Sequence, residues 1–272
     1  MHSYSVVSVP PDVDRSPVAG LSLREKDLEV RLARDEEDLC AAQRLRFEVF
    51  NLELRLGLAG SFASGLDRDA FDAHCDHLVV VDHRQQGVVG TYRLLHSDRL
   101  PSFGFYSETE FHLENVKRKG TRLLELGRSC VAPDYRSGRV IHLLFRGIAV
   151  YAQANGVDAM MGCASIRGND IEELREIVTL LRKSYWADPE FRVTPKRGFD
   201  LPGIDVPVDV DDTEVFQRLP PLFKGYLRLG AKVCGLPAFD RQFGTTDFFI
   251  LLPTGDIVER YGRRFFSQEQ LA

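Results

Sequence analysis

Residues 122–163 decide the fold, and they read RLLELGRSCVAPDYRSGRVIHLLFRGIAVYAQANGVDAMMGC. Residues 122–131 are mostly apolar and stop shortly before a proline, which predicts a buried strand. Residues 140–155 are strongly apolar and are followed by Gly156, which favours the end of a helix. Residues 157–163 predict another short strand. This strand–helix–strand order is typical of a βαβ unit.

Further elements flank this unit on both sides. The expected elements are a strand at 28–33, a helix from the N-cap Asp35 to about residue 54, a hairpin of strands at 77–82 and 87–95, an amphipathic helix at 171–185, a loop at 201–214, a helix at 220–234 and a strand at 243–252. Runs of antiparallel strands with βαβ units inserted indicate a mixed, mostly antiparallel α/β sheet flanked by helices.

The domain organisation is simple. Residues 1–28 are rich in proline and are expected to be a flexible tail. Residues 29–272 are expected to form one domain, in which residues 201–272 add an acidic loop and a C-terminal helix and strand. With 44% hydrophobic residues, the chain can bury a sizeable core without a metal or a disulfide.

Charge and cysteine content exclude several classes of protein. The net charge of −5 argues against a nucleic-acid binder. The five cysteines are odd in number and widely spaced, which indicates reduced thiols and a cytoplasmic location. The N-terminus has no signal-peptide pattern, and the longest apolar runs are too short to span a bilayer.

Four stretches place charged residues beside or within apolar elements. They are RLRFEVF at 44–50, FDAHCDHL at 71–78, GTYRLL at 90–95 and ELGRSCV at 125–131. Charges in such places are costly unless they are paired or used. Any one of them alone is best explained by a structural salt bridge, but the four together favour a functional site. Gly127 makes a bulge plausible between Glu125 and Arg128.

The chain resembles the ornithine N-acyltransferases, also called hemolysin-like acyltransferases. The resemblance rests on the motifs at 44–50, 71–78 and 125–131, which occur in this order, and on PAFDRQFGTTDFFILL at 237–252. The ornithine N-acyltransferases are GNAT-fold acyltransferases related to acyl-homoserine lactone synthases, and the resemblance covers about residues 30–252. It implies a GNAT-like sheet with a C-terminal extension. It also implies transfer of a 3-hydroxyacyl group from acyl carrier protein to the α-amine of ornithine, the first step of ornithine lipid synthesis, without a further cofactor.

The same resemblance implies the site residues. Charged positions shared with the lactone synthases are matched by Arg46, Asp72, Asp76, Arg93, Glu125 and Arg128. Acylation of an amine requires a proton acceptor, for which Glu125 is the first candidate and Glu48 and Asp76 are alternatives. Arg93 or Arg128 could hold the acceptor carboxylate as a bidentate fork, with Arg46 and Asp72 in the same substrate-binding group.

The donor is expected to be a carrier-protein thioester. Acetyl-CoA-dependent GNAT enzymes carry a loop with two glycines that binds the pyrophosphate, whereas YRSGRV at 135–140 keeps one. An acyl carrier protein presents a single phosphate, which such a loop can accommodate. We expect Val131 and neighbouring amides to face the thioester, and Arg136, Gly138 and Arg139 to receive the acidic carrier protein.

Two features admit other interpretations. Residues 74–77, HCDH, could suggest a metal, but alternation along a strand separates the ligands, and we expect none. Cys75 or Cys130 could act as a nucleophile, although buried, inert cysteine is commoner. A basic stripe of Lys224, Arg228 and Lys232 is either a solvated helix face or a contact with anionic lipid at the inner membrane face.

Other functions stay open on the sequence alone. The acceptor could be another amino acid, such as lysine, glutamine or tyrosine, or the product could be a signal like an acyl-homoserine lactone. A different class of function is a GNAT-like scaffold that binds an acyl chain without turnover. Such a scaffold has no need to keep Glu125 and its matching arginines.

Overall fold

The computed structural model describes residues 20–118 and 121–255. Within these residues nine strands form one sheet in the order β1-β2-β3-β4-β6-β7-β11-β10, and β9 pairs with β11. The strands are β1 (Ser22–Glu25), β2 (Leu28–Leu32), β3 (Asp76–Asp82), β4 (Gly87–His96), β6 (Leu123–Val131), β7 (Ala159–Arg167), β9 (Lys232–Val233), β10 (Ala238–Asp240) and β11 (Thr245–Pro253). Strands β6 and β7 pair in parallel and the other neighbours are antiparallel, which confirms the predicted mixed sheet.

Helices and a small second sheet surround this sheet. The helices are α1 (Glu36–Phe47), α2 (Arg139–Ala154), α3 (Ile171–Ser184), α4 (Asp212–Arg218) and α5 (Pro221–Leu229), and a π-helical segment η1 (Glu48–Glu53) extends α1. Short 3₁₀ segments are η2 (Ala59–Ala63), η3 (Asp72–His74), η4 (Ser97–Arg99), η5 (Tyr106–Thr109), η6 (Pro133–Tyr135) and η7 (Pro189–Phe191). Strands β5 (Phe111–His112) and β8 (Thr194–Pro195) pair with each other.

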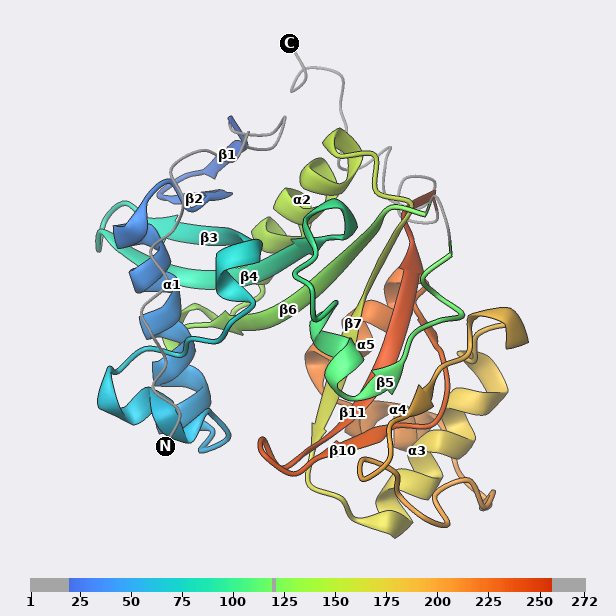
Figure 1. Ribbon diagram of the computed structural model, residues 1–272. Helices are drawn as coiled ribbons and strands as arrows, with labels where there is room; N and C mark the ends of the chain where they lie inside the picture. Colours follow the sequence, from blue (N-terminus) through green and yellow to red (C-terminus); the bar gives the residue numbers. More distant parts are fainter. Residues whose placement is uncertain (1–19, 119–120, 256–272) are drawn as a thin grey trace, which may run out of the picture.

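The two halves of the sheet part between β6 and β7. The pairing joins Leu123 to Ala159, Leu124 to Met160 and Glu125 to Met161, and then it ends. Beyond Glu125 the two strands run apart, so that the group of β1, β2, β3, β4 and β6 and the group of β7, β11 and β10 form two diverging blades (Figure 1). Among the described residues, no strand pairs with the carboxyl-terminal half of β6 on its β7 side.

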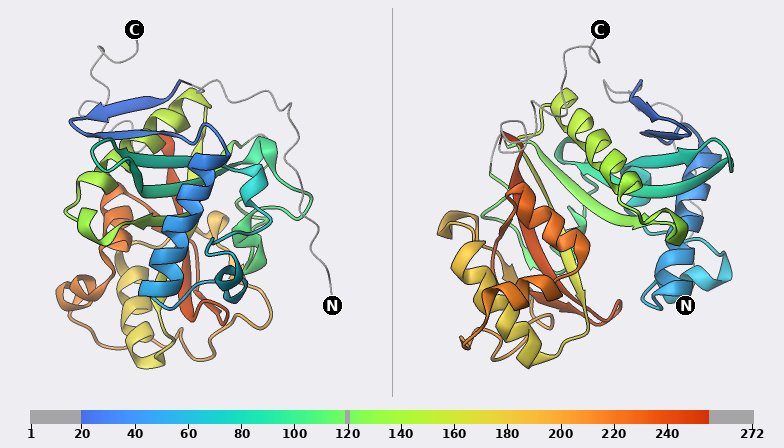
Figure 2. Two further views of the ribbon diagram at one scale, coloured as in Figure 1. Left: turned by 90° about the vertical axis from the view of Figure 1, so that its left-hand side faces the viewer. Right: turned by 180° about the vertical axis from the view of Figure 1, so that it is seen from behind.

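Apolar faces hold the helices against these blades. Helices α1 and α2 lie on opposite faces of the first blade (Figure 2). Leu143, Leu144 and Ile148 of α2 are buried in the main core together with strand residues of both blades. Gly147 allows α2 to approach closely, because a Cβ there would lie 2.9 Å from a methyl group of Val30. Burial of this kind, at about 25 cal/mol per Å², is the main stabilising contribution to such a fold.

Most of the expected elements are present, but several boundaries differ. Asp35 is the N-cap of α1, as predicted, and accepts a hydrogen bond from the backbone N–H of Asp38. The expected tail is shorter at its carboxyl end, because Ser22–Glu25 pair with β2; residues 1–19 lie outside the described part of the chain. The expected loop at 201–214 contains the start of α4, where the side chain of Asp211 accepts from two backbone N–H groups.

The predicted helix at 220–234 is wrong at its end. Helix α5 stops at Leu229, because Gly230 adopts a left-handed conformation with φ of 103° and caps the helix. Lys232 therefore lies in β9 and not on a helical stripe with Lys224 and Arg228. Lys224 donates a hydrogen bond to the carbonyl of Gln217, and Arg228 lies over the ring of Phe216. The basic stripe does not exist as the sequence predicted it.

Among the helices of residues 20–118 and 121–255, none is long and apolar enough to cross a membrane.

Candidate active site

A cavity of about 440 Å³ opens where β6 and β7 separate. One side is apolar and is lined by side chains of η1, α5 and the β10–β11 turn, among them Phe50, Leu54, Phe223, Tyr226 and Phe243. The other side carries polar and charged groups from five strands and η5, among them Arg93, Glu125, Arg128, Asp240 and Asp247. An apolar wall facing a few convergent polar groups is the usual character of a small-molecule site.

Local backbone features create the opening. On β6, Arg128 has a φ of +50°, and the register with β4 shifts between Thr91 and Arg93, so the sequence expectation of a bulge beside Gly127 is confirmed. Gly162 of β7 lies against the carbonyl of Leu126, where a Cβ would come within 2.4 Å of the oxygen. A larger residue at Gly162 would push the strands apart before they reach the cavity.

Glu125 lies at the point where the strands separate and is one of the residues that line the cavity. Its Oε2 accepts a hydrogen bond from the backbone N–H of Tyr106 at 2.7 Å, and its Oε1 accepts one from Ser107, also at 2.7 Å. Burial raises the pKa of Glu125, although these donors and the charge of Arg93 oppose the rise. A carboxylate in this position is a stronger proton acceptor than an exposed one.

A buried ion network lies next to the cavity. Its members are three arginines and three aspartates, namely Arg46, Arg93, Arg128, Asp67, Asp69 and Asp72. Arg46 is fully buried, and its guanidinium donates to Asp67 at 2.9 Å and to the two oxygens of Asp72 at 3.1 and 2.8 Å. Each positive charge therefore has a negative partner, which burial requires.

Arg93 and Arg128 complete this network and also face the cavity. Arg93 donates to Asp69 at 2.6 Å and to Asp72 at 3.0 Å, and Arg128 donates to Asp69 at 3.1 Å. Burial alone would raise the pKa of Asp72, but Arg46 and Arg93 outweigh it and hold that pKa well below its usual range. Asp72 is thus ionised at neutral pH.

The predicted substrate-binding residues divide into two pairs. Arg93 and Arg128 line the cavity, whereas Arg46 and Asp72 are sealed inside the network and do not. Asp67 and Asp69 were not among the predicted site residues, although they share the segment GLDRDAFD with Asp72. The spacing of these aspartates was the available signal, since three acids in six residues beside an apolar strand need partners.

Neither alternative to Glu125 reaches the cavity. Asp76 lies outside the lining, and its carboxylate accepts hydrogen bonds from Arg99 at 3.0 Å and from the Tyr151 hydroxyl at 2.6 Å. Glu48 is an exposed residue that follows α1. The structure therefore places only Glu125 of the three candidate bases where a substrate in this cavity could meet it.

The cysteines suit the inert interpretation. All five thiols are free, as expected. Burial raises the pKa of Cys75 well above its usual range and that of Cys130 to about 12, which disfavours the reactive thiolate. His77 hydrogen-bonds the carbonyl of Asp72 and is not engaged with either thiol.

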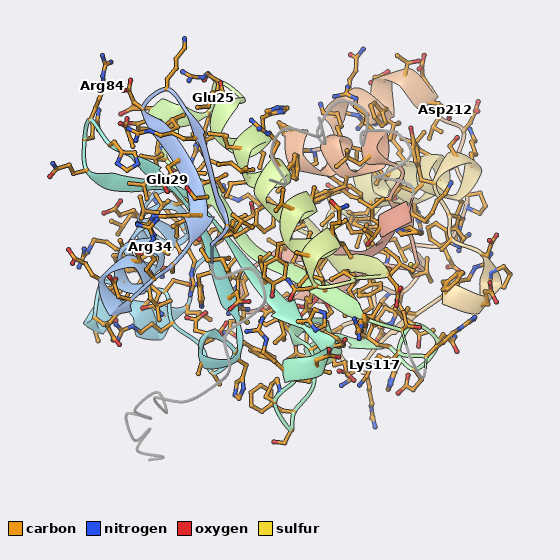
Figure 3. All side chains as sticks on the ribbon, turned by 90° about the horizontal axis from the view of Figure 1, so that it is seen from above. Glu25, Glu29, Arg34, Arg84, Lys117 and Asp212 are labelled. Carbon is orange, nitrogen blue, oxygen red and sulfur yellow. The ribbon has the colours of Figure 1, made fainter. Side chains whose placement is uncertain are left out.

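The residues expected to receive the donor gather at the connection between β6 and α2. Gly138 is the N-cap of α2 with a φ of 97°, and Val131 ends β6. Arg136 donates to the carbonyl of Val131 and forms a bidentate pair with Glu53 at 2.5 and 2.7 Å. Arg139 lies 3.7 Å from Glu25, which sits over α2 in Figure 3. Both arginines are exposed but partly neutralised.

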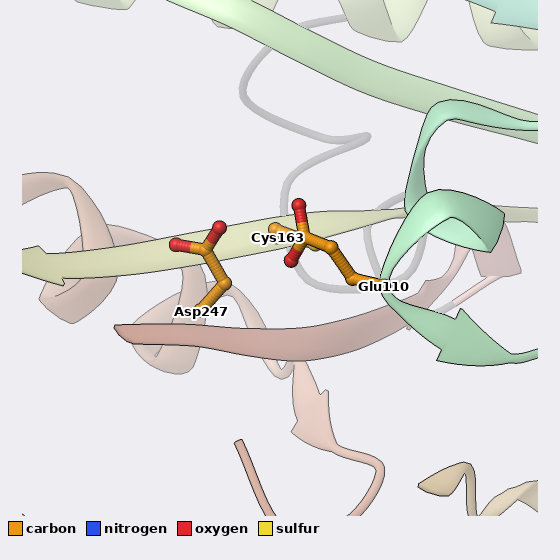
Figure 4. A group of neighbouring side chains, drawn as sticks. All are labelled: Glu110, Cys163 and Asp247. Atoms are coloured by element: carbon orange, nitrogen blue, oxygen red, sulfur yellow. The ribbon is translucent and has the colours of Figure 1, made fainter. Parts of the chain in front are cut away.

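A second group of acids was not anticipated. We call Glu110, Asp240 and Asp247 the acidic cluster. Oxygen atoms of Glu110 and Asp247 and the sulfur of Cys163 lie within 4.8 Å of one another (Figure 4), and these three side chains could hold a metal or another cation. Asp247 interrupts the apolar strand TTDFFILL, which was the signal available in the sequence.

Comparison with known proteins identifies the family. A model of an acetyltransferase (GNAT) domain matches residues 45–146. The chain is 39% identical over 259 residues to the L-ornithine N(alpha)-acyltransferase of Rhizobium meliloti (strain 1021), covering 90% of this chain and 86% of the relative. It is 40% identical over 256 residues to the enzyme of that name from Agrobacterium fabrum, covering 89% and 86%. The chain belongs to the L-ornithine N(alpha)-acyltransferase family.

A solved structure agrees on the fold. The crystal structure of the AHL synthase LasI superposes with a TM-score of 0.50 at 12% identity, covering 86% of this chain and 95% of that chain. Together with the family, this confirms the GNAT-like architecture that the sequence motifs predicted. Since the family consists of named acyltransferases, the interpretation of the chain as an acyl-binding scaffold without turnover loses its basis.

Proposed function

We propose that this protein transfers a 3-hydroxy fatty acyl group from acyl carrier protein to the α-amine of ornithine, the first step of ornithine lipid synthesis. The family and its 38–40% identity to named ornithine acyltransferases support the acceptor. The observation that carries the reaction is the position of Glu125. It is a buried carboxylate in the cavity wall at the point where β6 and β7 part.

The chemistry follows from this geometry. Glu125, directly or through a water molecule, takes a proton from the α-ammonium of the acceptor, because only the neutral amine is a nucleophile. The amine attacks the thioester carbonyl, an N–C bond forms, and the C–S bond breaks as the thiol leaves with a proton. Backbone N–H groups of β6 beyond Glu125, for which the described part of the chain provides no strand partner on the β7 side, can stabilise the oxyanion.

The two sides of the cavity suit the two substrates. The apolar side, with Phe50, Leu54 and Phe223, suits the acyl chain. On the polar side, Arg128 is the better partner for the acceptor carboxylate, since its side chain is 10% exposed and that of Arg93 is 4% exposed. A guanidinium matches a carboxylate by two parallel hydrogen bonds.

The loop before α2 bears on the identity of the acyl donor. The single glycine of the loop before α2, Gly138, supports a carrier-protein thioester over coenzyme A. Such a donor places the reaction in the cytoplasm, with the lipid product leaving at the inner membrane face. Arg136 and Arg139, exposed beside α2, supply positive charge for an acidic carrier.

One reaction tests the proposal. The purified protein is incubated with a 3-hydroxyacyl carrier-protein thioester and an equimolar mixture of amino acids, and the products are identified by mass spectrometry with assignment of the acylated nitrogen. We expect α-N-acylornithine as the main product, and a much lower kcat/KM when acyl-CoA replaces the carrier-protein thioester. The absence of an amide product, or a different amino acid as the main acceptor, contradicts the assignment of ornithine. Equal kcat/KM values for acyl-CoA and the carrier-protein thioester contradict only the assignment of the donor.

A further inference from the structure

The acidic cluster has charge that the protein itself does not balance. Glu110 is 1% exposed and Asp247 is 5% exposed. Both carboxylate oxygens of Glu110, and Oδ1 of Asp247, have no hydrogen-bond partner among the described residues. Burying carboxylates without partners costs several kcal/mol for each ion, so such a group calls for a cation or a proton.

The acidic neighbours of Glu110 make its negative charge still less favourable. Burial raises its pKa to about 10, and the charges of Asp247 and Asp240 add to the rise. Oδ1 of Asp240 accepts hydrogen bonds from the backbone N–H groups of Gln242 and Phe243, at 2.7 and 3.1 Å. Glu110 therefore holds a proton at neutral pH unless a cation replaces it.

The cluster opens into the cavity already assigned to the substrates. Asp240 and Asp247 both line that cavity, and Glu110 lies behind them. Figure 4 shows the carboxylates of Asp247, from β11, and of Glu110, from the segment after η5, on either side of Cys163. A cation that enters the cavity therefore comes next to Asp240 and Asp247.

A single residue connects the cluster with the proposed base. The backbone N–H of Ser107 donates to Glu125, and its hydroxyl lies 3.5 Å from the sulfur of Cys163. The charge of Glu125 is close enough to raise the pKa of Glu110. A small amino acid with its α-amine at Glu125 thus has the acidic cluster within reach of its side chain.

We propose that Glu110, Asp240 and Asp247 bind the side-chain ammonium of the acceptor and thereby select diamino acids over monoamino acids. An ammonium offers three donors, which matches the three oxygens without partners in Glu110 and Asp247. This inference rests on the proposed function, because it assumes that the acceptor enters this cavity. It adds the residues that recognise the second amine.

The test compares two acceptors that differ in that amine alone. Norvaline has the carbon skeleton of ornithine without the terminal amine. For the wild type we expect kcat/KM for ornithine to exceed that for norvaline by roughly 10³-fold or more, because norvaline leaves the buried acids unpaired. Asp247→Asn should lower kcat/KM for ornithine by about 100-fold, in the range of a lost charged contact. The constant for norvaline should change by less than about threefold in the same variant.

Controls separate recognition from folding. Asp209→Asn alters an exposed acid away from the cavity and should leave both constants unchanged. Glu110→Gln provides a second variant, for which the same selective loss is expected, and unfolding curves verify that both variants fold. Equal losses for ornithine and norvaline would overturn the proposal, since they indicate a general structural role.

A binding measurement keeps this inference distinct from the proposed function. Calorimetric titration with ornithine and with norvaline requires no turnover, so preferential binding of ornithine that Asp247→Asn abolishes supports the cluster even if no acylornithine forms. Equal affinity for the two amino acids contradicts it. A stoichiometric metal that survives dialysis of the wild type and is absent from Asp247→Asn also overturns the proposal in favour of a metal site.

Discussion

The ion network and the acidic cluster are both buried and both border the same cavity, yet they are opposite in charge balance. In the network, three arginines face three aspartates, and the pKa values of Asp69 and Asp72 are held below their usual range against the effect of burial. In the cluster, burial and neighbouring acids raise the pKa values of Glu110 and Asp247. A complete set of charges holds the fold together, whereas an incomplete set marks where a ligand belongs.

The largest expected effect concerns Glu125, which lies between the two regions. The charge of Arg93 acts on Glu125, and that of Glu125 acts on Glu110. Glu125→Gln should lower kcat by roughly 10²–10⁴-fold, the range for a general base. The loss should shrink at high pH, where more of the acceptor amine is already neutral. Steady-state kinetics across pH measure this.

Glu125 also holds η5, so its variant needs a matched control. Glu108→Gln removes another carboxylate that accepts a backbone N–H of this turn, that of Phe105, but it lies outside the cavity lining. A comparable loss of kcat in both variants would assign Glu125 to the shape of the turn and not to proton transfer. Normal turnover in a folded Glu125→Gln would exclude it as the base.

The second effect concerns the completeness of the network. Arg46→Met leaves Asp67 and Asp72 short of their buried partner and should lower the free energy of unfolding by about 3–5 kcal/mol. Arg44→Met, an exposed position on the same helix, should change it by about 0.5 kcal/mol or less. Urea unfolding measures both. Similar losses in the two variants would show that the network does not stabilise the fold.

The third effect is the pH dependence of the cluster. Glu110 has its pKa raised from 4.5 to about 10, so the folded protein holds a proton that the unfolded chain releases. The contribution of this proton to the free energy of unfolding is fully present below pH 4.5 and is lost as the pH rises towards 10. Glu110→Gln does not show this loss, because glutamine has no proton to release. Its free energy of unfolding should therefore rise relative to that of the wild type by up to about 1.4 kcal/mol per pH unit.

Urea unfolding at about pH 6 and about pH 9 measures that slope. Glu114→Gln is the control, because Glu114 is 80% exposed and should give the same difference from wild type at both pH values. A pH-independent difference for Glu110→Gln would mean that Glu110 is already ionised in the folded protein, and hence that the cluster has a cationic partner.

The smallest expected effect lies at the surface, far from either region. Arg136→Glu should raise KM for the carrier-protein thioester by up to about tenfold with kcat nearly unchanged, since steering acts on encounter. Glu53→Gln removes the partner of Arg136 and should lower the same KM. Changes in the same direction for both variants, or no change, would remove Arg136 from carrier docking.

The sequence predicted one of these regions far better than the other. Arg46, Arg93, Arg128 and Asp72 stand in motifs where charges interrupt apolar elements, so their burial and pairing could be expected. Their partners Asp67 and Asp69 come from a loop, whose path no periodicity specifies. Asp247, Asp240 and Glu110 meet only because β10, β11 and the segment after η5 converge, which tertiary structure alone determines.

The same distinction explains why two of the predicted site residues lie outside the cavity. Glu48 and Asp76 share motifs with network residues, but the side chain of Asp76 pairs with Arg99 and Glu48 is exposed. Proximity in sequence did not translate into a shared cavity. The fold itself followed more directly, since residues 122–163 do form β6, α2 and β7 and set the opening between the two blades.

The most direct test of the contrast is the sign of one pair of stability changes. Asp72→Asn and Asp247→Asn make the same substitution at two buried positions, one in the ion network and one in the acidic cluster. Urea unfolding near neutral pH gives the free energy of unfolding of each variant. Asp72→Asn should destabilise the fold by about 3–5 kcal/mol, because Arg46 and Arg93 lose a partner. Asp247→Asn should leave the stability unchanged or raise it, because the new amide can donate to Glu110. Equal destabilisation by both would contradict the account.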